Sequence, residues 1–425
     1  MMALTLFGVF FGLVIINVPI ALSLALAAVV PLIAFTDLPL LVVVQRFFTA
    51  TDSFPFMAIP FFMIAGGVLE KGGVSKRLVD LAMSLVGGLP GGLAIVTMVA
   101  SAFFGAISGS STATVAAIGS IMVPAMMREG YSLKFSLATV ASAGYLGVII
   151  PPSIPMVTFG LATGASVGDL FMAGFIPGIF ACAAMSIPAY FYGKKNIPIT
   201  GKFSLDNFLK AFKEAIWALF MPIIILGGIY GGIFTPTEAA AVACTYGLIV
   251  GFFVYKELNL KVLYEILKSS ASSAAMIMFI VATAASFGFV ITREMIPMQV
   301  AAYITSLTSS PVIFMLLVNA LLLLVGTFME TNAAILILAP IFMPIVHQMN
   351  IDVVAFGLIM VLNLAIGTLT PPLGVNLFVA AGLQNTKIDN VVNIHLWLYL
   401  FVSISVLLFL TFFPTVITFL PKLLN

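Results

Sequence analysis

Charged side chains are scarce in this sequence: Lys, Arg, Asp and Glu make up 8% of its 425 residues, whereas 62% are hydrophobic. A soluble globular chain carries about 25% charged residues. Apolar runs of roughly 17–25 residues, the length that crosses a bilayer as a helix, recur along the chain. Alternating polar and apolar strands dominate nowhere, which argues against an outer-membrane barrel. The sequence therefore predicts an all-α polytopic membrane protein.

Cysteines are also few, and the sequence contains no recognisable nucleotide-binding motif. The two cysteines, Cys182 and Cys244, lie inside apolar runs, so neither a disulfide framework nor a metal site is expected. The sequence contains no G-x-x-x-x-G-K-[ST] loop, so the chain itself shows no means of hydrolysing ATP. Met1–Asn17 lacks a basic region, which favours a retained membrane segment over a cleaved signal. We expect a membrane protein that is not an enzyme and has no nucleic-acid partner.

What the sequence does contain is a pair of matching polar interruptions, in residues 108–160 and 328–380. A constant offset of 220 pairs Ser111-Thr112 with Thr331-Asn332, Pro124 with Pro344, Gly147 with Gly367, and Pro151-Pro152 with Pro371-Pro372. Paired interruptions in two halves of a chain are the best sequence indication of a secondary transporter's binding site.

Each stretch begins with two apolar arms joined by a tip rich in hydroxyl or amide groups. The arms have about 15 residues, or roughly 22 Å, which is short for a full crossing. We therefore expect two re-entrant helical hairpins, and after each one a broken transmembrane helix that is interrupted by Gly…Pro-Pro. The expected hairpins are at about 90–128 and 311–349, and the expected broken helices are at 132–162 and 353–384. Pro152 and Pro372 should fall in the first turn of the resumed helices.

The order of elements predicts two inverted-topology repeats, 1–192 and 216–425, separated by a cytoplasmic amphipathic linker at 193–215. Each repeat should contain two crossings, an amphipathic arm, a crossing, a short helix, the hairpin, the broken helix and a last crossing. In the second repeat the arm is expected at Glu257–Lys268, the crossing after it at Ala271–Ile291 and the last crossing at Leu396–Phe419.

The distribution of positive charge predicts the orientation. With both termini outside the cytoplasm, fourteen of the 17 Lys and Arg residues fall on the cytoplasmic side, whereas the opposite orientation would leave three there. The two hairpins would then enter from opposite faces, and their tips would meet near the middle of the membrane.

Tips and breaks join helix C-termini, which carry free carbonyls, to helix N-termini, which carry free N–H groups. Side-chain and carbonyl oxygens at such points can surround a small cation, so we expect one cation site in each half. The first site would comprise Ser110, Ser111 and Thr112 with the backbone of Gly147–Ile150. The second would comprise Glu330, Thr331 and Asn332 with the backbone of Gly367–Thr370.

An anionic substrate should lie between the tips, because helix N-termini attract anions. The expected substrate-binding residues are Ala113, Ser153, Ala333 and Leu373 at the helix starts, with Thr158 and Asn376 one turn further on. For any single Ser or Thr, close helix packing is an equally good explanation. The pairing of the pattern in both halves favours binding. Glu238, which follows Thr235-Pro236-Thr237, is expected to cap its helix.

Four motifs make the chain resemble a known family across essentially its whole length. They are ISGSSTATVAAIGSIMVPAM (Ile107–Met126), GVIIPPSIP (Gly147–Pro155), GGIFTPTEAAAVA (Gly231–Ala243) and IGTLTPPLGVNLF (Ile366–Phe378). The chain resembles the large membrane (M, or DctM-like) subunit of tripartite ATP-independent periplasmic (TRAP) transporters.

The resemblance implies an elevator-type ion-transporter fold, and Na⁺-coupled import of an organic acid across the bacterial inner membrane. It implies a separate small four-helix membrane (Q) subunit and a periplasmic substrate-binding protein (P subunit) as partners. Family substrates include sialic acid, C4-dicarboxylates and 2-oxo acids. The tips do not distinguish these substrates, and sialic acid is our first choice.

Two alternative functions stay open. One is a stand-alone sodium/carboxylate symporter of similar design. Such carriers show Ser-Asn-Thr at both tips, whereas this chain has Ser-Ser-Thr and Glu-Thr-Asn, which argues against that reading. The other is a channel or scaffold subunit.

Overall fold

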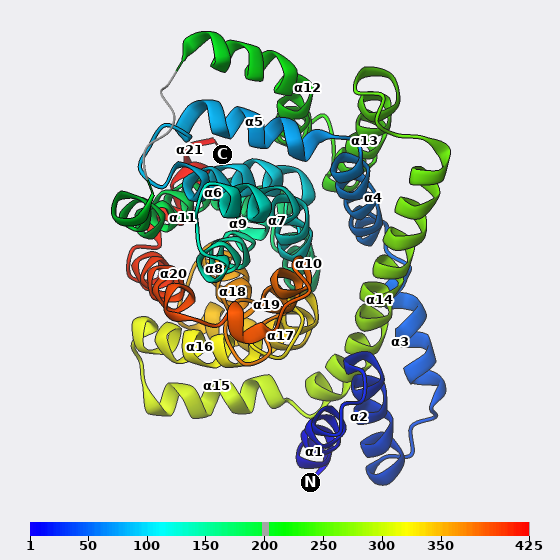
Figure 1. Cartoon of the computed structure of the whole chain (residues 1–425). Helices are drawn as coiled ribbons and strands as arrows, with labels where there is room; N and C mark the ends of the chain where they lie inside the picture. Colours follow the sequence, from blue (N-terminus) through cyan, green and yellow to red (C-terminus); the bar gives the residue numbers. More distant parts are fainter. Residues whose placement is uncertain (198–203, 425) are drawn as a thin grey trace.

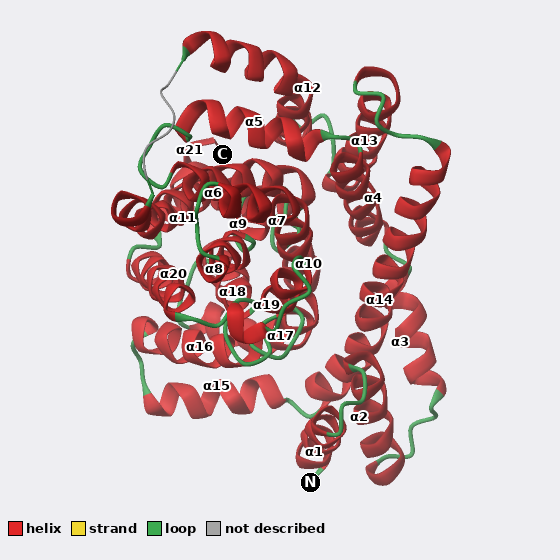
Figure 2. Cartoon of the chain, viewed as in Figure 1, coloured by secondary structure: helices red, strands yellow, loops and turns green. Residues whose placement is uncertain are grey.

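The computed structural model describes residues 1–197 and 204–424 of the chain, and these residues form helices joined by loops, without a strand (Figure 2). Among them, seven helices are long and apolar enough to cross a membrane, or eight if one bent pair counts as a single span. The predicted all-α, multi-span class is therefore confirmed.

The helices gather into two groups (Figure 1). The group that carries the two polar tips, here the tip group, comprises α6 (Gly92–Ser108), α7 (Ser111–Arg128), α8 (Leu133–Ala143), α9 (Leu146–Ile149), α10 (Ile154–Thr163), α11 (Val167–Asn196), α16 (Pro311–Gly326), α17 (Thr331–Gln348), α18 (Val353–Gly367), α19 (Val375–Gly382), α20 (Ile394–Phe412) and α21 (Thr415–Leu424). The second group, here the frame group, comprises α1 (Met2–Ile15), α2 (Ile20–Phe35), α3 (Leu41–Thr51), α4 (Ala58–Lys71), α13 (Pro236–Ile249) and α14 (Leu260–Arg293).

Three helices lie along the edges of the tip group in Figure 1. Helices α5 (Val74–Val86) and α12 (Leu205–Tyr230) pack on each other along one edge, and α15 (Ile296–Leu307) lies along the opposite edge. The start of α5 is fixed by Arg77, whose Nη1 lies 2.8 Å from Glu257 Oε1 and whose guanidinium stacks on the Tyr255 ring.

Helix α14 is one continuous helix of 34 residues, whereas the sequence predicted a separate amphipathic arm at Glu257–Lys268 and a crossing at Ala271–Ile291. That prediction was wrong because Ser269 and Ser270, which separate the two parts, do not interrupt a helix as Pro or Gly would. The Ser270 hydroxyl donates to the Met63 carbonyl oxygen of α4 at 3.4 Å, so this polar residue also attaches α14 to its neighbour.

Two other expected boundaries differ from the structure. The amphipathic part of the predicted linker is the first part of α12, which continues without a break into the next crossing, and residues 198–203 of that linker lie outside the described residues. The last crossing, expected at Leu396–Phe419, is divided into α20 and α21 at Phe413–Pro414, because a proline ring is incompatible with the preceding helical turn.

The first broken crossing is confirmed, since Leu133–Ile149 and Ile154–Thr163 meet at an angle of 43°. In the second half, α18 and α19 are separated by a longer break at residues 368–374. Pro152 and Pro372 lie before the resumed helices rather than in their first turns, because α10 is capped by Ser153 and α19 by Gly374.

Glycine pairs allow these breaks to approach the tip-bearing helices closely. A Cβ added to Gly105 of α6 would lie 2.6 Å from the Gly147 Cα, and one added to Gly367 would lie 2.4 Å from the Gly326 Cα of α16. Both contacts are backbone against backbone, so any larger residue would separate the helices.

Candidate functional site

A cavity of about 280 Å³ lies between the two polar tips and the frame group. From the tip group it is lined by Gly109, Ser110, Ser111, Thr112, Val148, Ile154, Pro155, Glu330, Thr331, Asn332, Thr368 and Val375. From the frame group it is lined by Met63 of α4 and by Ser273, Met276, Ile277 and Ile280 of α14. The two tips, far apart in sequence, therefore face one cavity.

The first tip is a sharp turn between α6 and α7. Gly109 adopts a left-handed conformation (φ 60°), and the Ser110 Oγ caps α7 by accepting a hydrogen bond from the Ala113 N–H at 3.4 Å. The Ser110 and Thr112 hydroxyl oxygens lie 3.3 Å apart. The Gly109 carbonyl accepts from the Ile154 N–H at 3.3 Å, so the tip is also attached to the start of α10.

The second tip differs because its cap is a carboxyl group rather than a hydroxyl group. Glu330 caps α17: its Oε2 accepts from the Ala333 N–H at 3.0 Å, and its Oε1 accepts from the Asn332 Nδ2 at 2.7 Å. A carboxylate at this place compensates the positive end of the helix dipole. Glu330 is the one ionisable residue among those that line the cavity.

Each tip is connected to the resumed helix of the other half by one buried hydrogen bond. The Asn376 Nδ2 of α19 donates to the Ser111 Oγ at 2.7 Å, and the Thr158 hydroxyl of α10 donates to the Asn332 Oδ1 at 2.9 Å. The side chains of Asn376 and Thr158 are fully buried, and the Asn376 Oδ1 has no hydrogen-bond partner among the described residues. We refer to these two contacts as the cross-tip bonds.

The backbone atoms expected at the first cation site are unequally placed. A Cβ at Gly147 would lie 2.2 Å from the Thr114 Oγ1 and 2.8 Å from the Ser110 carbonyl oxygen, so Gly147 lies directly beneath the first tip. Ile150 instead packs its side chain against Gly178 of α11.

At the second break, Gly367 packs against Gly326, and the Thr370 hydroxyl donates to the Ile366 carbonyl oxygen at 2.9 Å. Thr368, which the sequence did not single out, lines the cavity.

The structure thus brings together six of the predicted side chains, those of both tips, around the cavity. Ala113, Ser153, Thr158, Ala333 and Asn376 do not line it: Ser153 caps α10, the amide N–H groups of Ala113 and Ala333 are bound by the caps, and the other two form the cross-tip bonds. The α14 residues were missed because an apolar helix with scattered serines carries no distinguishing pattern.

The donors at the tips are hydroxyl, amide and carboxylate oxygens, and no group of three or more His, Cys, Asp or Glu side chains that could hold a metal occurs in the described part of the chain. Backbone and side-chain oxygens at broken helices suit Na⁺. Glu238 has the expected capping role: its backbone N–H donates to the Thr235 Oγ1 at 3.3 Å, and its Oε2 accepts from the Thr235 N–H at 2.8 Å.

The family model and the relatives that match this chain all point to one protein family. The family model described as "Tripartite ATP-independent periplasmic transporter, DctM component" matches residues 7–416. An isethionate TRAP transporter permease, DctMQ, of Oleidesulfovibrio alaskensis is 48% identical over 97% of this chain, which spans 65% of that protein. A C4-dicarboxylate TRAP large permease, DctM, of Pseudomonas aeruginosa is 42% identical over 95% of this chain and 94% of that protein. The sialic acid permease SiaT of Haemophilus influenzae is 36% identical over 89% of this chain and 62% of that protein.

Among solved structures, the YdaH transporter of Alcanivorax borkumensis superposes with a TM-score of 0.65 at 16% identity, over 87% of this chain and 86% of that one. This likeness concerns the fold alone. The match over residues 7–416, together with relatives at 48% and 42% identity, shows that the chain belongs to the DctM family of TRAP transporter large permeases and is a transporter rather than an enzyme.

Proposed function

We propose that this chain imports a small organic anion across the bacterial inner membrane, driven by co-transported Na⁺. The observation that carries the proposal is the cavity between the two tips, where oxygen-rich turns and helix N-termini face the same 280 Å³. Helix N-termini favour an anion, whereas unwound backbone and side-chain oxygens favour Na⁺.

The first Na⁺ site would use the hydroxyls of Ser110, Ser111 and Thr112 with the backbone at Gly147. The second would use Glu330, Thr331 and Asn332, with Thr368 added from the cavity wall and the backbone at Gly367. Thr370 is a weaker candidate, because its carbonyl oxygen accepts from the Gly374 N–H at 3.1 Å and its hydroxyl donates to the Ile366 carbonyl oxygen. The Ile150 backbone stays in the proposed first site, since the packing of its side chain on Gly178 does not involve its carbonyl oxygen.

The substrate we favour is a C4-dicarboxylate or a short sulfonate such as isethionate. Relatives named for these anions have 48% and 42% identity with this chain, whereas the sialic acid permease has 36%. Our first choice from sequence, sialic acid, is thus the less supported one.

The partners we propose are a small Q subunit and a periplasmic binding protein. The family name supports a tripartite, periplasmic system, and the name DctMQ of the O. alaskensis relative supports association with a Q subunit. We further propose two inverted repeats, with both termini in the periplasm, and an elevator motion of the tip group against the frame group.

Reconstitution tests the proposal. Proteoliposomes that hold this chain and its Q subunit should take up the anion when the loaded binding protein and an inward Na⁺ gradient are supplied. Uptake unchanged after external Na⁺ is replaced by K⁺ would refute Na⁺ coupling. Uptake by this chain alone would instead support the stand-alone symporter, and currents independent of solute would support a channel.

A further inference from the structure

A second cavity, of about 520 Å³, lies away from the tips, where the end of α11 meets the start of α20. Its walls include Phe135, Tyr192 and Tyr399, and its polar side chains include Lys195 and His395. The Phe135 and Tyr192 rings stack with centroids 3.5 Å apart, and the His395 ring meets both edge-on at 5.1 and 5.2 Å. The cavity is therefore bounded by a rigid aromatic cluster.

The position of the cavity along two helices indicates the depth where a membrane meets water. Val167–Asn196 and Ile394–Phe412 are both candidate membrane spans, and the cavity is lined by the last three turns of the first and the first two turns of the second. Tyrosine and tryptophan gather at the headgroup level of bilayers. The aromatic cluster and Trp397, which is 50% exposed on α20, fit this level.

The polar rim of the cavity carries uncompensated positive charge. Lys195 forms no ion pair with any described residue. The hydroxyls of the aromatic cluster are already used, since Tyr192 donates to Ser132 and the Tyr399 hydroxyl lies 3.1 Å from that of Thr139. The Lys195 ammonium, the His395 ring and the second N–H of the Asn196 amide remain as donors in the cavity.

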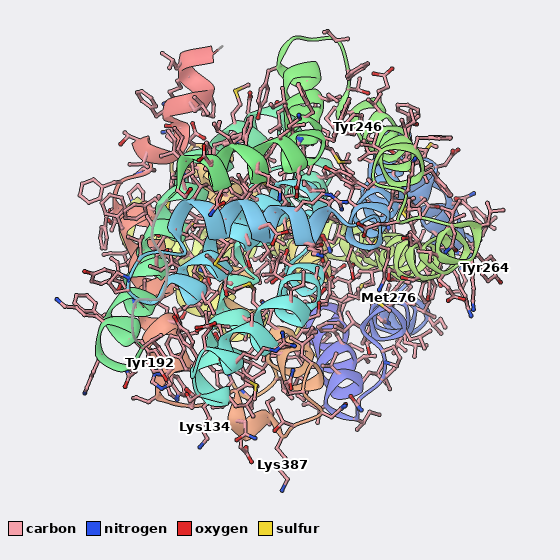
Figure 3. The ribbon with its side chains drawn as sticks, turned by 45° about the horizontal axis from the view of Figure 1, so that its top comes forward. Lys134, Tyr192, Tyr246, Tyr264, Met276 and Lys387 are labelled. Carbon is pink, nitrogen blue, oxygen red and sulfur yellow. The ribbon has the colours of Figure 1, made fainter. Side chains whose placement is uncertain are left out.

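Further lysines strengthen the positive potential. Lys134 and Lys387 point outward from the lower edge of Figure 3, on the same side as Tyr192. The Lys134 carbonyl oxygen accepts from the Asn393 Nδ2 at 3.0 Å, which joins the start of α8 to the start of α20. Attraction to an anionic headgroup is about 1 kcal/mol for each basic residue near a membrane surface.

The opposite wall of the cavity is apolar and opens toward the membrane. Phe191 is 64% exposed and Leu398 is 47% exposed, and both line the cavity. Phe401, one turn along α20 from Leu398, is 68% exposed, so the apolar surface continues along the span. A free phosphate or sugar phosphate has no apolar part to bury against this wall, whereas a phospholipid has an acyl chain.

We propose that this cavity is a binding site for an anionic phospholipid. The headgroup phosphate would be held by Lys195 and His395, and an acyl chain would lie on Phe191, Leu398 and Phe401. The bound lipid would join the ends of α8, α11 and α20 within the tip group. The site does not depend on which anion the protein transports.

Native mass spectrometry of the detergent-solubilised chain tests the proposal, with phosphatidylglycerol as the ligand and phosphatidylcholine as the neutral comparison. We expect phosphatidylglycerol to be retained preferentially, and the Lys195→Gln variant to lower its retention about fivefold. The matched control is Lys194→Gln, which removes the same charge from the neighbouring position outside the cavity and should change retention less than twofold.

Three results would overturn the proposal. They are equal retention of the two lipids, equal effects of Lys195→Gln and Lys194→Gln, and displacement of the lipid by glycerol 3-phosphate at the same concentration. The last result would mean that the phosphate group alone determines binding. Because both lysines are exposed, neither variant should prevent folding, and the variant Leu398→Gln tests the apolar wall independently, with reduced retention expected.

Discussion

Asn376 and Thr158 form hydrogen bonds with the tips and do not line the cavity between them. Both were expected to contact substrate, but each is buried and is hydrogen-bonded to a tip residue of the other half, Ser111 or Asn332. Ser111 and Asn332 belong to the two proposed Na⁺ sites. We therefore propose that Asn376 and Thr158 are positioning residues, which orient the proposed Na⁺ ligands without lining the cavity.

Replacement of Asn376 by alanine should weaken Na⁺ activation more than it lowers the maximal rate. The substitution removes the donor to Ser111 Oγ, and a buried hydrogen bond contributes about 1 kcal/mol, or about fivefold in a binding constant. The Na⁺ concentration for half-maximal uptake should rise about fivefold in proteoliposomes.

Asn319→Ala is the control for this measurement. Asn319 is also buried; it donates to Thr411 of α20 at 2.9 Å and accepts from Asn363 of α18 at 2.9 Å, and none of these three residues lines the cavity. It should lower thermal stability without changing the Na⁺ dependence. If Asn376→Ala leaves half-maximal activation unchanged, the cross-tip bonds do not position the Na⁺ ligands.

At the scale of single elements, the sequence predicted starts and breaks better than continuity. The two tips could be located because polar residues interrupt apolar runs there, and Thr235 with Glu238 formed a recognisable helix start signal. The capping roles of Ser110 and Glu330 were not predicted, because both residues were assigned only to cation sites. The sequence did not predict that α14 is continuous. The stretch before Ser269 and Ser270 is amphipathic and the stretch after them is apolar, and this difference suggested two separate helices. Which residues of α14 line the cavity is determined by tertiary packing, so the local sequence does not predict them.

The capping box at the start of α13 gives a prediction for this element. Thr235→Ala should destabilise the protein by about 1 kcal/mol, because it removes the side-chain acceptor for the Glu238 N–H. Thr245→Ala in the same helix is the matched control, since its hydroxyl only bonds back to the Ala241 carbonyl oxygen. A lower midpoint of thermal unfolding is expected for the first variant alone, and equal midpoints would show that the cap does not limit stability.

At the scale of the whole molecule, the cavity lies between the tip group and the frame group, and a motion between the groups must change its walls. Met276, labelled in Figure 3, lies on α14 of the frame group, whereas Val375 lies at the start of α19 in the tip group. Both line the cavity and are partly exposed, at 62% and 43%. This pair can therefore report on the proposed elevator motion.

Cross-linking Met276→Cys to Val375→Cys should stop transport if the groups move against each other. The background would carry Cys182→Ala and Cys244→Ala, and a cleavable bifunctional thiol reagent would join the pair. Uptake should be lost on cross-linking and should return after cleavage.

The control pair is Arg46→Cys with Phe289→Cys, which joins two residues already stacked within the frame group, with the guanidinium carbon 4.8 Å from the ring centroid. Cross-linking this pair should leave uptake unchanged. Normal uptake by the cross-linked Met276–Val375 pair would contradict an elevator motion of these groups.

The cross-tip bonds also have a consequence for how the protein is made. Ser111 precedes its partner Asn376 by 265 residues. At a synthesis rate of about 5–20 residues per second, the first tip therefore waits roughly 13–53 s before its partner is translated. During that time its polar residues need another partner, either water or the insertion machinery. The proposed transport site is consequently among the last parts of the molecule to be completed during biogenesis.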